Sequence, residues 1–334
     1  MEDKMKKLLT IILLCLTSTI LLIVLTVYAQ ADSWRQDPLD IKTGKEQEHG
    51  AANLEGVIDV HIHYAPDSEL RALDALEAAR IALRYGMRAL LFKNHHTQTA
   101  SLAYLVSQAV TGIEAYGGIA LNSSVGGINP IAVERMARTT GRLGRVVWMP
   151  TRDSEHYNKT LEPNPHFVPI SRNGELLPEV KEVLAVMARE DLALGTGHSS
   201  PAESLLLIRV AKSMGIERII VTHPMARAVG MTVEQQVEAA RMGAYLEYCF
   251  VPLLPYDTGK IKPEGALPIE ELVTAIRAVG PAHAIISTDL GQPLNPVLTD
   301  GMIAFIRQLK VQAFTQKEID QMSKINPAKF LGLQ

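Results

Sequence analysis

From residue 56 to the end of the sequence, short apolar runs alternate with longer stretches of helical period. Runs rich in β-branched residues are typical of strands, and apolar residues that recur every three or four positions are typical of helices. A chain that alternates the two builds βα units around a parallel sheet. The expected strands are GVIDVHIH, RALLFKNHH, AYGGIALN, RVVWMPT, LALGTGHSS, RIIVTHP, AYLEYCFVP and HAIISTDLG. The expected helices cover 69–85, 101–111, 130–140, 177–189, 201–214, 232–242, 268–279 and 298–309.

These βα units fit an α/β fold of the (β/α)8 TIM-barrel type over residues 56–334, with an extra helix at the C-terminus. Such barrels are about 250 residues long. An open doubly wound sheet is the alternative. The Gly-rich turns GTGHSS and VGGINP do not match G-x-G-x-x-G, so a dinucleotide site has little support.

Local signals mark the ends of several elements. The capping-box pattern predicts helix starts at Ser200 with Glu203, Thr232 with Gln235 and Thr315 with Glu318. Two long loops, 152–176 and 251–268, would follow the fourth and seventh strands, on the face where barrel loops build active sites. Asn173-Gly174 in the first of these loops predicts a tight hairpin.

Residues 1–31 form a different kind of segment. A charged start, MEDKMKK, precedes a long apolar run, and Ala29 and Ala31 form an A-x-A cleavage pattern. This predicts a secretory signal peptide, although the run is longer than the usual ~7–15 residues. About 20 apolar residues can span a bilayer, so an uncleaved anchor over residues 8–27 is the alternative. Residues 32–55 are polar and aperiodic and read as a linker. We therefore expect an exported protein, periplasmic or extracellular, or one anchored in the membrane.

Composition narrows the partners. The chain has 334 residues, 47% of them hydrophobic, and a net charge of −3, which gives no support for nucleic-acid binding. No run of like charge and no basic cluster marks a phosphate site. Cys15 lies in the leader, which leaves Cys249 alone and excludes a disulfide within the mature chain. We expect a small-molecule substrate and membrane contact only through an uncleaved N-terminal segment. The sequence does not indicate an oligomeric state.

The first expected strand carries two histidines one residue apart, in VIDVHIHYAPDS. Successive side chains of a strand alternate between faces, so Asp59, His61 and His63 would share one face. Two imidazoles on one face are a suitable pair of metal ligands. Asp59 would then orient an imidazole from behind, or be satisfied inside the barrel by backbone or water.

Other polar side chains stand at the C-terminal ends of the expected strands, where a barrel delivers side chains into its active-site mouth. Neutral imidazoles and carboxylates are ligands that Zn²⁺ and similar cations prefer. The pattern therefore predicts a metal site. The residues are Lys93, His95, His198, His223 and Asp289.

Further residues are candidates for substrate binding. His95 and the backbone at Gly126 and Gly127 are such candidates, although the two glycines also fit a tight turn. Glu247 and Tyr248 lie near the end of the seventh strand, where alternation places only one of them inward.

The motifs DVHIH, GTGHSS, VTHP and STDLG resemble the amidohydrolase superfamily of metal-dependent hydrolases, and INPAKFLGL is similar to its closing segment. The resemblance covers about residues 56–334 and is closest to an uncharacterised branch. It implies metal ligation by His61, His63, His198, His223 and Asp289. It also implies that Asp289 takes a proton from a metal-activated water, and that His223, if not a ligand, polarises the substrate carbonyl.

The resemblance also bears on the number of metals. Binuclear members bridge two metals with a carbamylated lysine or a glutamate from strand four, and VVWMPTRDS has neither at its tip. One divalent metal is therefore favoured over two, Zn²⁺ before Mn²⁺ or Fe²⁺. Lys93 is an exception to this argument, because it has three readings: a carbamate that bridges metals, an ammonium that binds a carboxylate or an oxyanion, or a solvated side chain.

The function that follows is hydrolysis of a small amide, imide, lactone or ester, with Asp289, His223 and Lys93 as catalytic candidates. Three alternatives remain: a decarboxylase with a similar mononuclear metal, a barrel that binds metal or ligand without turnover, and a barrel with neither. A deaminase is disfavoured because Ser-Ser-Pro follows His198 in place of H-x-x-E.

Overall fold

The computed structural model describes residues 54–334 except 162–163, 258–259 and 262–264. The expected leader and nearly all of the expected linker lie outside the described residues, and their boundaries stay predictions. Within the described part, eight parallel strands form one sheet. In spatial order they are β1 (Ile58–Ile62), β2 (Ala89–Phe92), β3 (Glu114–Ala120), β4 (Gly144–Trp148), β7 (Ala193–Gly195), β8 (Ile219–Val221), β9 (Tyr245–Cys249) and β12 (Ala284–Ser287).

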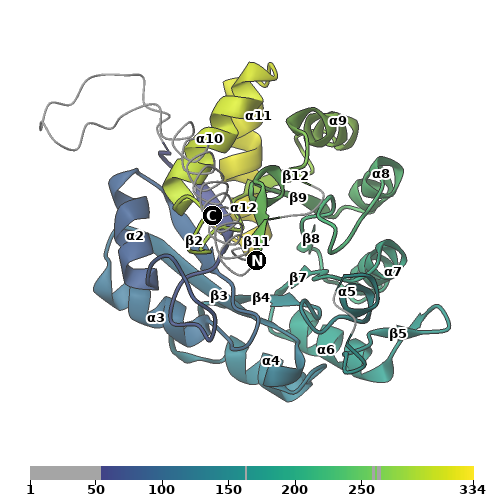
Figure 1. The fold of residues 1–334 in the computed structure, drawn as a ribbon. Helices are drawn as coiled ribbons and strands as arrows, with labels where there is room; N and C mark the ends of the chain where they lie inside the picture. The colour runs from purple at the N-terminus through teal and green to yellow at the C-terminus, as the bar shows by residue number, and fades with distance from the viewer. Residues whose placement is uncertain (1–53, 162–163, 258–259, 262–264) are drawn as a thin grey trace, which may run out of the picture. The chain divides into compact units, whose positions relative to one another are not determined.

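The last strand returns to the first, so the sheet forms a nearly closed barrel. Asp289 N donates to His61 O at 2.8 Å, and His63 N donates to Leu290 O at 2.7 Å. The expected barrel is thereby confirmed. Helices surround it in chain order (Figure 1). They are α2 (Ala75–Arg84), α3 (Ala100–Ala109), α4 (Pro130–Ala137), α6 (Pro178–Arg189), α7 (Pro201–Ser213), α8 (Val233–Arg241), α9 (Ile269–Val279) and α10 (Leu298–Val311).

Smaller elements complete the fold. The short helix α5 (Glu155–Thr160) lies in the loop after β4. The expected C-terminal helix is confirmed as α11 (Gln316–Asp320), a π-helical turn (Gln321–Ile325) and α12 (Asn326–Leu331). All three expected capping boxes are present. No helix within the described residues combines the length and apolar character that a membrane crossing requires.

Two hairpins lie in the long loops. The first pairs β5 (Ser171–Arg172) with β6 (Glu175–Leu176), and the second pairs β10 (Tyr256–Asp257) with β11 (Lys260–Ile261). In the first, Asn173 and Gly174 have φ of 52° and 79°. Positive φ at both central residues is the requirement of a type I′ turn, so the hairpin predicted there is confirmed.

One helix start was predicted wrongly. The helix expected over 69–85 begins at Ala75, because the side chain of Asp74 accepts from Glu77 N and caps it there. The preceding residues form a loop in which Arg71 is ion-paired to Asp67. The apolar pattern alone did not distinguish this loop from a first helical turn.

Two apolar layers hold the barrel. The outer one packs strand residues against the helices, while the inner one contains Ile58, Val60 and Trp148 together with Phe330 and Leu331 of α12. The closing segment INPAKFLGL therefore packs against the barrel interior, and burial of these side chains stabilises the fold.

The closure of the barrel at Gly291 gives a stability test. Gly291 has φ +141°, and a Cβ there would lie 1.5 Å from His63 O. Backbone atoms cannot rotate away, so we expect Gly291→Ala to lower the free energy of unfolding by about 2–4 kcal/mol. Chemical denaturation measures the loss.

Gly230→Ala is the matched control. Its φ is +67°, and a Cβ there meets no atom within 4 Å. Only the left-handed backbone opposes alanine at this position, at about 1 kcal/mol. Equal losses in the two variants would contradict the close approach at the closure.

Candidate metal centre

The polar residues that the sequence places at strand ends meet at one cavity of about 300 Å³. It opens at the C-terminal ends of the strands, as expected for a barrel. The cavity is lined by His61, His63, Lys93, His95, His198, His223 and Asp289, among others. Residues from strands far apart in sequence are thus brought together as predicted.

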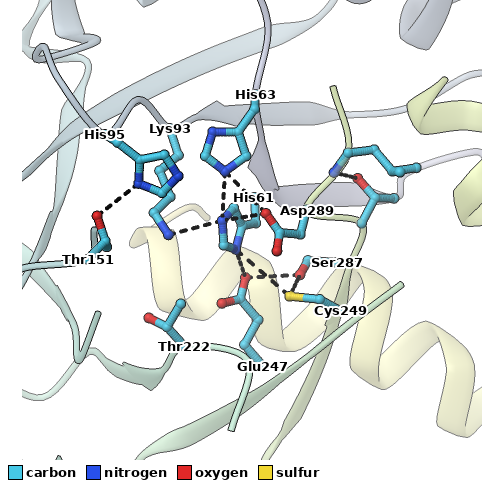
Figure 2. A network of polar contacts seen from close by, with 12 residues as sticks. His61, His63, Lys93, His95, Thr151, Thr222, Glu247, Cys249, Ser287 and Asp289 are labelled. Carbon is cyan, nitrogen blue, oxygen red and sulfur yellow. Dashed lines mark hydrogen bonds and ion pairs between the residues drawn. The ribbon is translucent and has the colours of Figure 1, made fainter. Parts of the chain in front are cut away.

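Three of these side chains direct one ligand atom each to a common point. His61 Nε2 lies 3.2 Å from His63 Nε2 and 3.0 Å from Asp289 Oδ1, and His63 Nε2 lies 3.1 Å from the same oxygen (Figure 2). Ligands about 2.1 Å from a first-row dication are roughly 3.0–3.4 Å from one another. The two imidazoles and the carboxylate therefore fit such a cation in spacing and in chemistry.

The other two histidines of the implied ligand set lie beside this point. The ring centroids of His198 and His223 are 5.0 Å apart, and that of His223 is 5.8 Å from that of His61. Both Nδ1 atoms are buried without a hydrogen-bond partner among the described residues. Burial lowers the pKa of His223 to about 4, so its imidazole is neutral near pH 7. Both rings are thus in the form that can bind a metal or accept a hydrogen bond.

Glu247 holds His61 from behind. His61 Nδ1 lies 3.1 Å from Glu247 Oε1, which also accepts from Ser287 Oγ at 2.9 Å. A carboxylate at Nδ1 fixes the ring so that Nε2 points to the ligand atoms of His63 and Asp289, and makes Nε2 more basic. Burial would lower the pKa of His61, but Asp289 and Glu247 outweigh it and raise the pKa to about 9. A bound cation would displace that proton.

Asp59 does not have the expected orienting role, because β1 changes register. The pairing of β1 with β2 is irregular between Asp59 and Ile62. Asp59 Oδ2 accepts from Thr288 Oγ1, and Oδ1 accepts from Thr288 N and His61 N. A bulge of this kind shifts side chains to the other face. The prediction that strict alternation joins Asp59 to the histidines is therefore wrong.

Lys93 is buried inside the cluster. Its side chain is 2% exposed, which excludes the reading as a solvated lysine. Lys93 Nζ lies 3.0 Å from His61 Nε2 and 5.3 Å from the ring centre of Trp148. Burial lowers the pKa of the Lys93 amine, and the nearby carboxylates only partly oppose this.

The protonated nitrogen of His95 follows from its neighbours. Asn122 Nδ2 donates to Thr151 Oγ1 at 2.7 Å, and that hydroxyl lies 2.8 Å from His95 Nδ1. Among the described contacts of the Thr151 hydroxyl, Nδ1 is the one acceptor for its hydrogen, and a hydroxyl that donates there leaves the proton of the neutral ring on Nε2. Because burial keeps the pKa of His95 well below its ordinary value, the ring is a neutral donor.

Two site residues have a backbone that L-residues rarely adopt. Asp289 has φ of 59° and His223 has φ of 24°. Such conformations cost about 1–3 kcal/mol and cluster at functional sites. Both residues come two positions after the end of a strand, so the strained backbone helps aim their side chains into the cavity.

Some predictions need correction or completion. Gly126 and Gly127 do not line the cavity; with φ of 92° and 67° they form a turn after β3. Of the pair at the end of β9, Glu247 points inward, while Tyr248 OH donates to Gln236 on α8. Cys249 is buried, as expected. The expectation of no basic cluster is wrong, because Arg71, Arg152 and Arg227 line the cavity from loops after three different strands.

Comparisons with known proteins agree with this fold. No curated protein matches the sequence. The family of unknown function DUF6282 matches over residues 56–247. A variant of a PTE-like lactonase from Deinococcus radiodurans is similar in structure, with a TM-score of 0.55, 15% identity, and 84% of this chain and 97% of that chain covered.

Two further structures have the same fold. For an amidohydrolase from Burkholderia multivorans with bound zinc, the TM-score is 0.56 at 13% identity, with 83% of this chain and 99% of that chain covered. For a metallopeptidase from Rhodobacter sphaeroides, it is 0.55 at 10% identity, with the same coverage. The resemblance to the amidohydrolase superfamily is thus confirmed at the level of the fold.

The role of Glu247 can be tested against that of Asp59. We expect Glu247→Gln to weaken zinc binding about 10- to 100-fold, because the charge that orients His61 and raises its basicity is lost. Asp59→Asn changes another buried carboxyl group of the same barrel, which contacts the backbone N–H of His61 but not its imidazole, and should change the affinity less than threefold. Competition with a fluorescent zinc chelator at neutral pH measures both. An equal effect of the two variants would contradict the assignment of Glu247.

Proposed function

Because the chain belongs to DUF6282, a family of unknown function, we propose its function from the site: a metal-dependent hydrolase that cleaves a small-molecule amide, imide, lactone or ester. The observation that carries this proposal is the group of His61 Nε2, His63 Nε2 and Asp289 Oδ1 at 3.0–3.2 Å from one another. The fold supports it, because structures of that fold include an amidohydrolase with bound zinc.

His61, His63 and Asp289 would hold one divalent metal, with His198 and His223 beside it. Two imidazoles and a carboxylate suit Zn²⁺, and also Mn²⁺ or Fe²⁺. When bound, the metal lowers the pKa of a water from ~15.7 towards ~7 and polarises a carbonyl. One metal is favoured because the C-terminal end of β4 supplies neither lysine nor glutamate.

The other side chains would accept or donate protons and stabilise negative charge on the substrate. Burial would raise the pKa of Asp289, but His61 and His63 hold it well below its ordinary range, so Asp289 is a carboxylate that can accept a proton. His95 would donate from Nε2 to an oxygen of the substrate. Lys93 or His223 would stabilise negative charge that develops on the substrate carbonyl.

The size of the cavity bears on the substrate, and the N-terminal sequence bears on the location of the protein. The cavity of about 300 Å³ lies at the lower end of the range for ligand sites, which favours a small substrate. Residues 1–31 favour export, as a cleaved signal peptide or as an anchor over residues 8–27. The structure describes neither segment.

A metal-dependence test addresses the proposal. We expect hydrolysis within a panel of esters, lactones, amides and imides that is lost on chelation and restored by zinc, manganese or iron. Asp289→Asn should lower kcat about 10²- to 10⁴-fold at saturating metal, since a proton acceptor is lost. Metal content is measured in the same samples.

The alternative of a binding barrel makes the opposite prediction. Without turnover, Asp289→Asn would change only the metal affinity. Hydrolysis that survives complete chelation, or an Asp289→Asn variant with full kcat, would contradict the proposal.

A further inference from the structure

Arginine side chains from three separate loops line the cavity. Arg71 lies in the loop after β1, Arg152 in the loop after β4 and Arg227 in the loop after β8. Lys93 adds an amine at the end of β2, and Asp289 is the one carboxylate that lines the cavity within the described chain. The cavity wall is therefore cationic, although the whole chain has a net charge of −3.

Carboxylates that do not line the cavity hold two of these arginines. Arg71 Nε and Nη2 lie 2.7 and 2.6 Å from Asp67 Oδ2. One oxygen of Glu69 lies 3.3 Å from Arg71 Nη2 and 3.9 Å from Arg152 Nη2. The two guanidinium groups, one from the loop after β1 and the other from the loop after β4, therefore lie on either side of Glu69. Asp67 holds the guanidinium of Arg71 in one position, and the N–H groups that Asp67 does not occupy can bind an oxyanion.

The charges of both arginines act at the centre of the site. Burial is the main cause of the low pKa of His63, which is about 3, and Arg71 lowers it further. Burial also dominates at His95 and His198, where Arg152 adds to the lowering. An anionic group on a ligand would therefore be attracted to the same region that holds the candidate metal ligands.

The other half of the cavity is apolar. Met225 comes from the loop after β8, and Val251 and Leu267 come from the segment after β9. A ligand that fits both halves has one charged end and a short apolar part, since the cavity holds about 300 Å³.

We propose that the substrate carries a negatively charged oxyanion group, a carboxylate or a phosphate, that Arg71 and Arg152 bind while the bond to be cleaved lies at His61, His63 and Asp289. This inference rests on the proposed function, because it assigns the substrate class of the same site. It makes the two arginines residues that determine specificity.

Binding of matched probes tests the inference. Succinate, succinamide and inorganic phosphate are titrated into the zinc-loaded full chain by calorimetry. Succinate and succinamide are similar in size and differ in charge. We expect succinate, phosphate or both to bind at least tenfold more tightly than succinamide, and the better anion identifies the natural group. Equal binding of the three probes would overturn the inference.

Variants separate the arginines from the metal. Arg152→Gln should weaken anion binding about 10- to 100-fold at unchanged zinc content, because a charge-assisted pair is lost. Arg152→Lys keeps the charge without the planar guanidinium, so its anion affinity should lie between those of the wild type and Arg152→Gln. Arg209→Gln, on the exposed face of α7, removes the same charge far from the cavity and should leave binding unchanged. If Arg152→Gln binds the anion as tightly as the wild type, the metal alone binds the anion, and the inference is overturned.

Hydrolysis distinguishes this inference from the proposed function. The mono-4-nitrophenyl ester of succinate is compared with its methyl ester, which masks the charge. A higher kcat/KM for the charged ester, lost in Arg152→Gln, supports both. Metal-dependent hydrolysis of both esters at equal kcat/KM overturns the inference alone. Selective anion binding without hydrolysis of any substrate in the panel overturns the proposed function and leaves an anion-binding site.

Discussion

The site depends on the closure of the barrel between β12 and β1. The backbone bonds from Asp289 N to His61 O and from His63 N to Leu290 O bring the two ends of the sheet into contact. The same bonds place the carboxylate of Asp289 within 3.1 Å of both imidazoles. The distance between ligand atoms is therefore set by the pairing of strands that are 222 or more residues apart in sequence.

Within the closed barrel, small departures from regular strand geometry determine the role of each polar residue at the site. With the change of register in β1, Asp59 contacts Thr288, and His61 contacts Glu247 on β9, the strand that pairs with β12. The backbone of Asp289, at φ 59°, aims its carboxylate into the cavity. Burial then removes water from the cluster, which strengthens each charge interaction inside it. The fit of the three ligand atoms to a metal ion and the low pKa of Asp289 both follow from this arrangement.

Sequence reasoning predicted the fold and most of the site because both follow from local patterns. Strand-length apolar runs with His, Lys or Asp at their ends predict a barrel with a polar mouth, and His61, His63 and Asp289 meet there. What it missed depends on tertiary structure. A bulge leaves no periodic signal, so strict alternation offers Asp59 as an orienting residue, beside the alternative that backbone or water satisfies it, and does not assign that role to Glu247. The arginines are far apart in sequence, and Arg71 lies in residues read as a helix, so only the folded chain shows them at one cavity.

The central claim is that His61 and His63 hold a metal ion. Its most direct test is the metal content of the full chain, determined by mass spectrometry beside a His61→Ala/His63→Ala variant. A His166→Ala/His283→Ala variant controls for the loss of two histidines outside the cavity. The account predicts close to one zinc, manganese or iron per chain in the wild type and the control, and none in the His61→Ala/His63→Ala variant. No metal in the wild type after reconstitution, or equal metal in all three proteins, would contradict it.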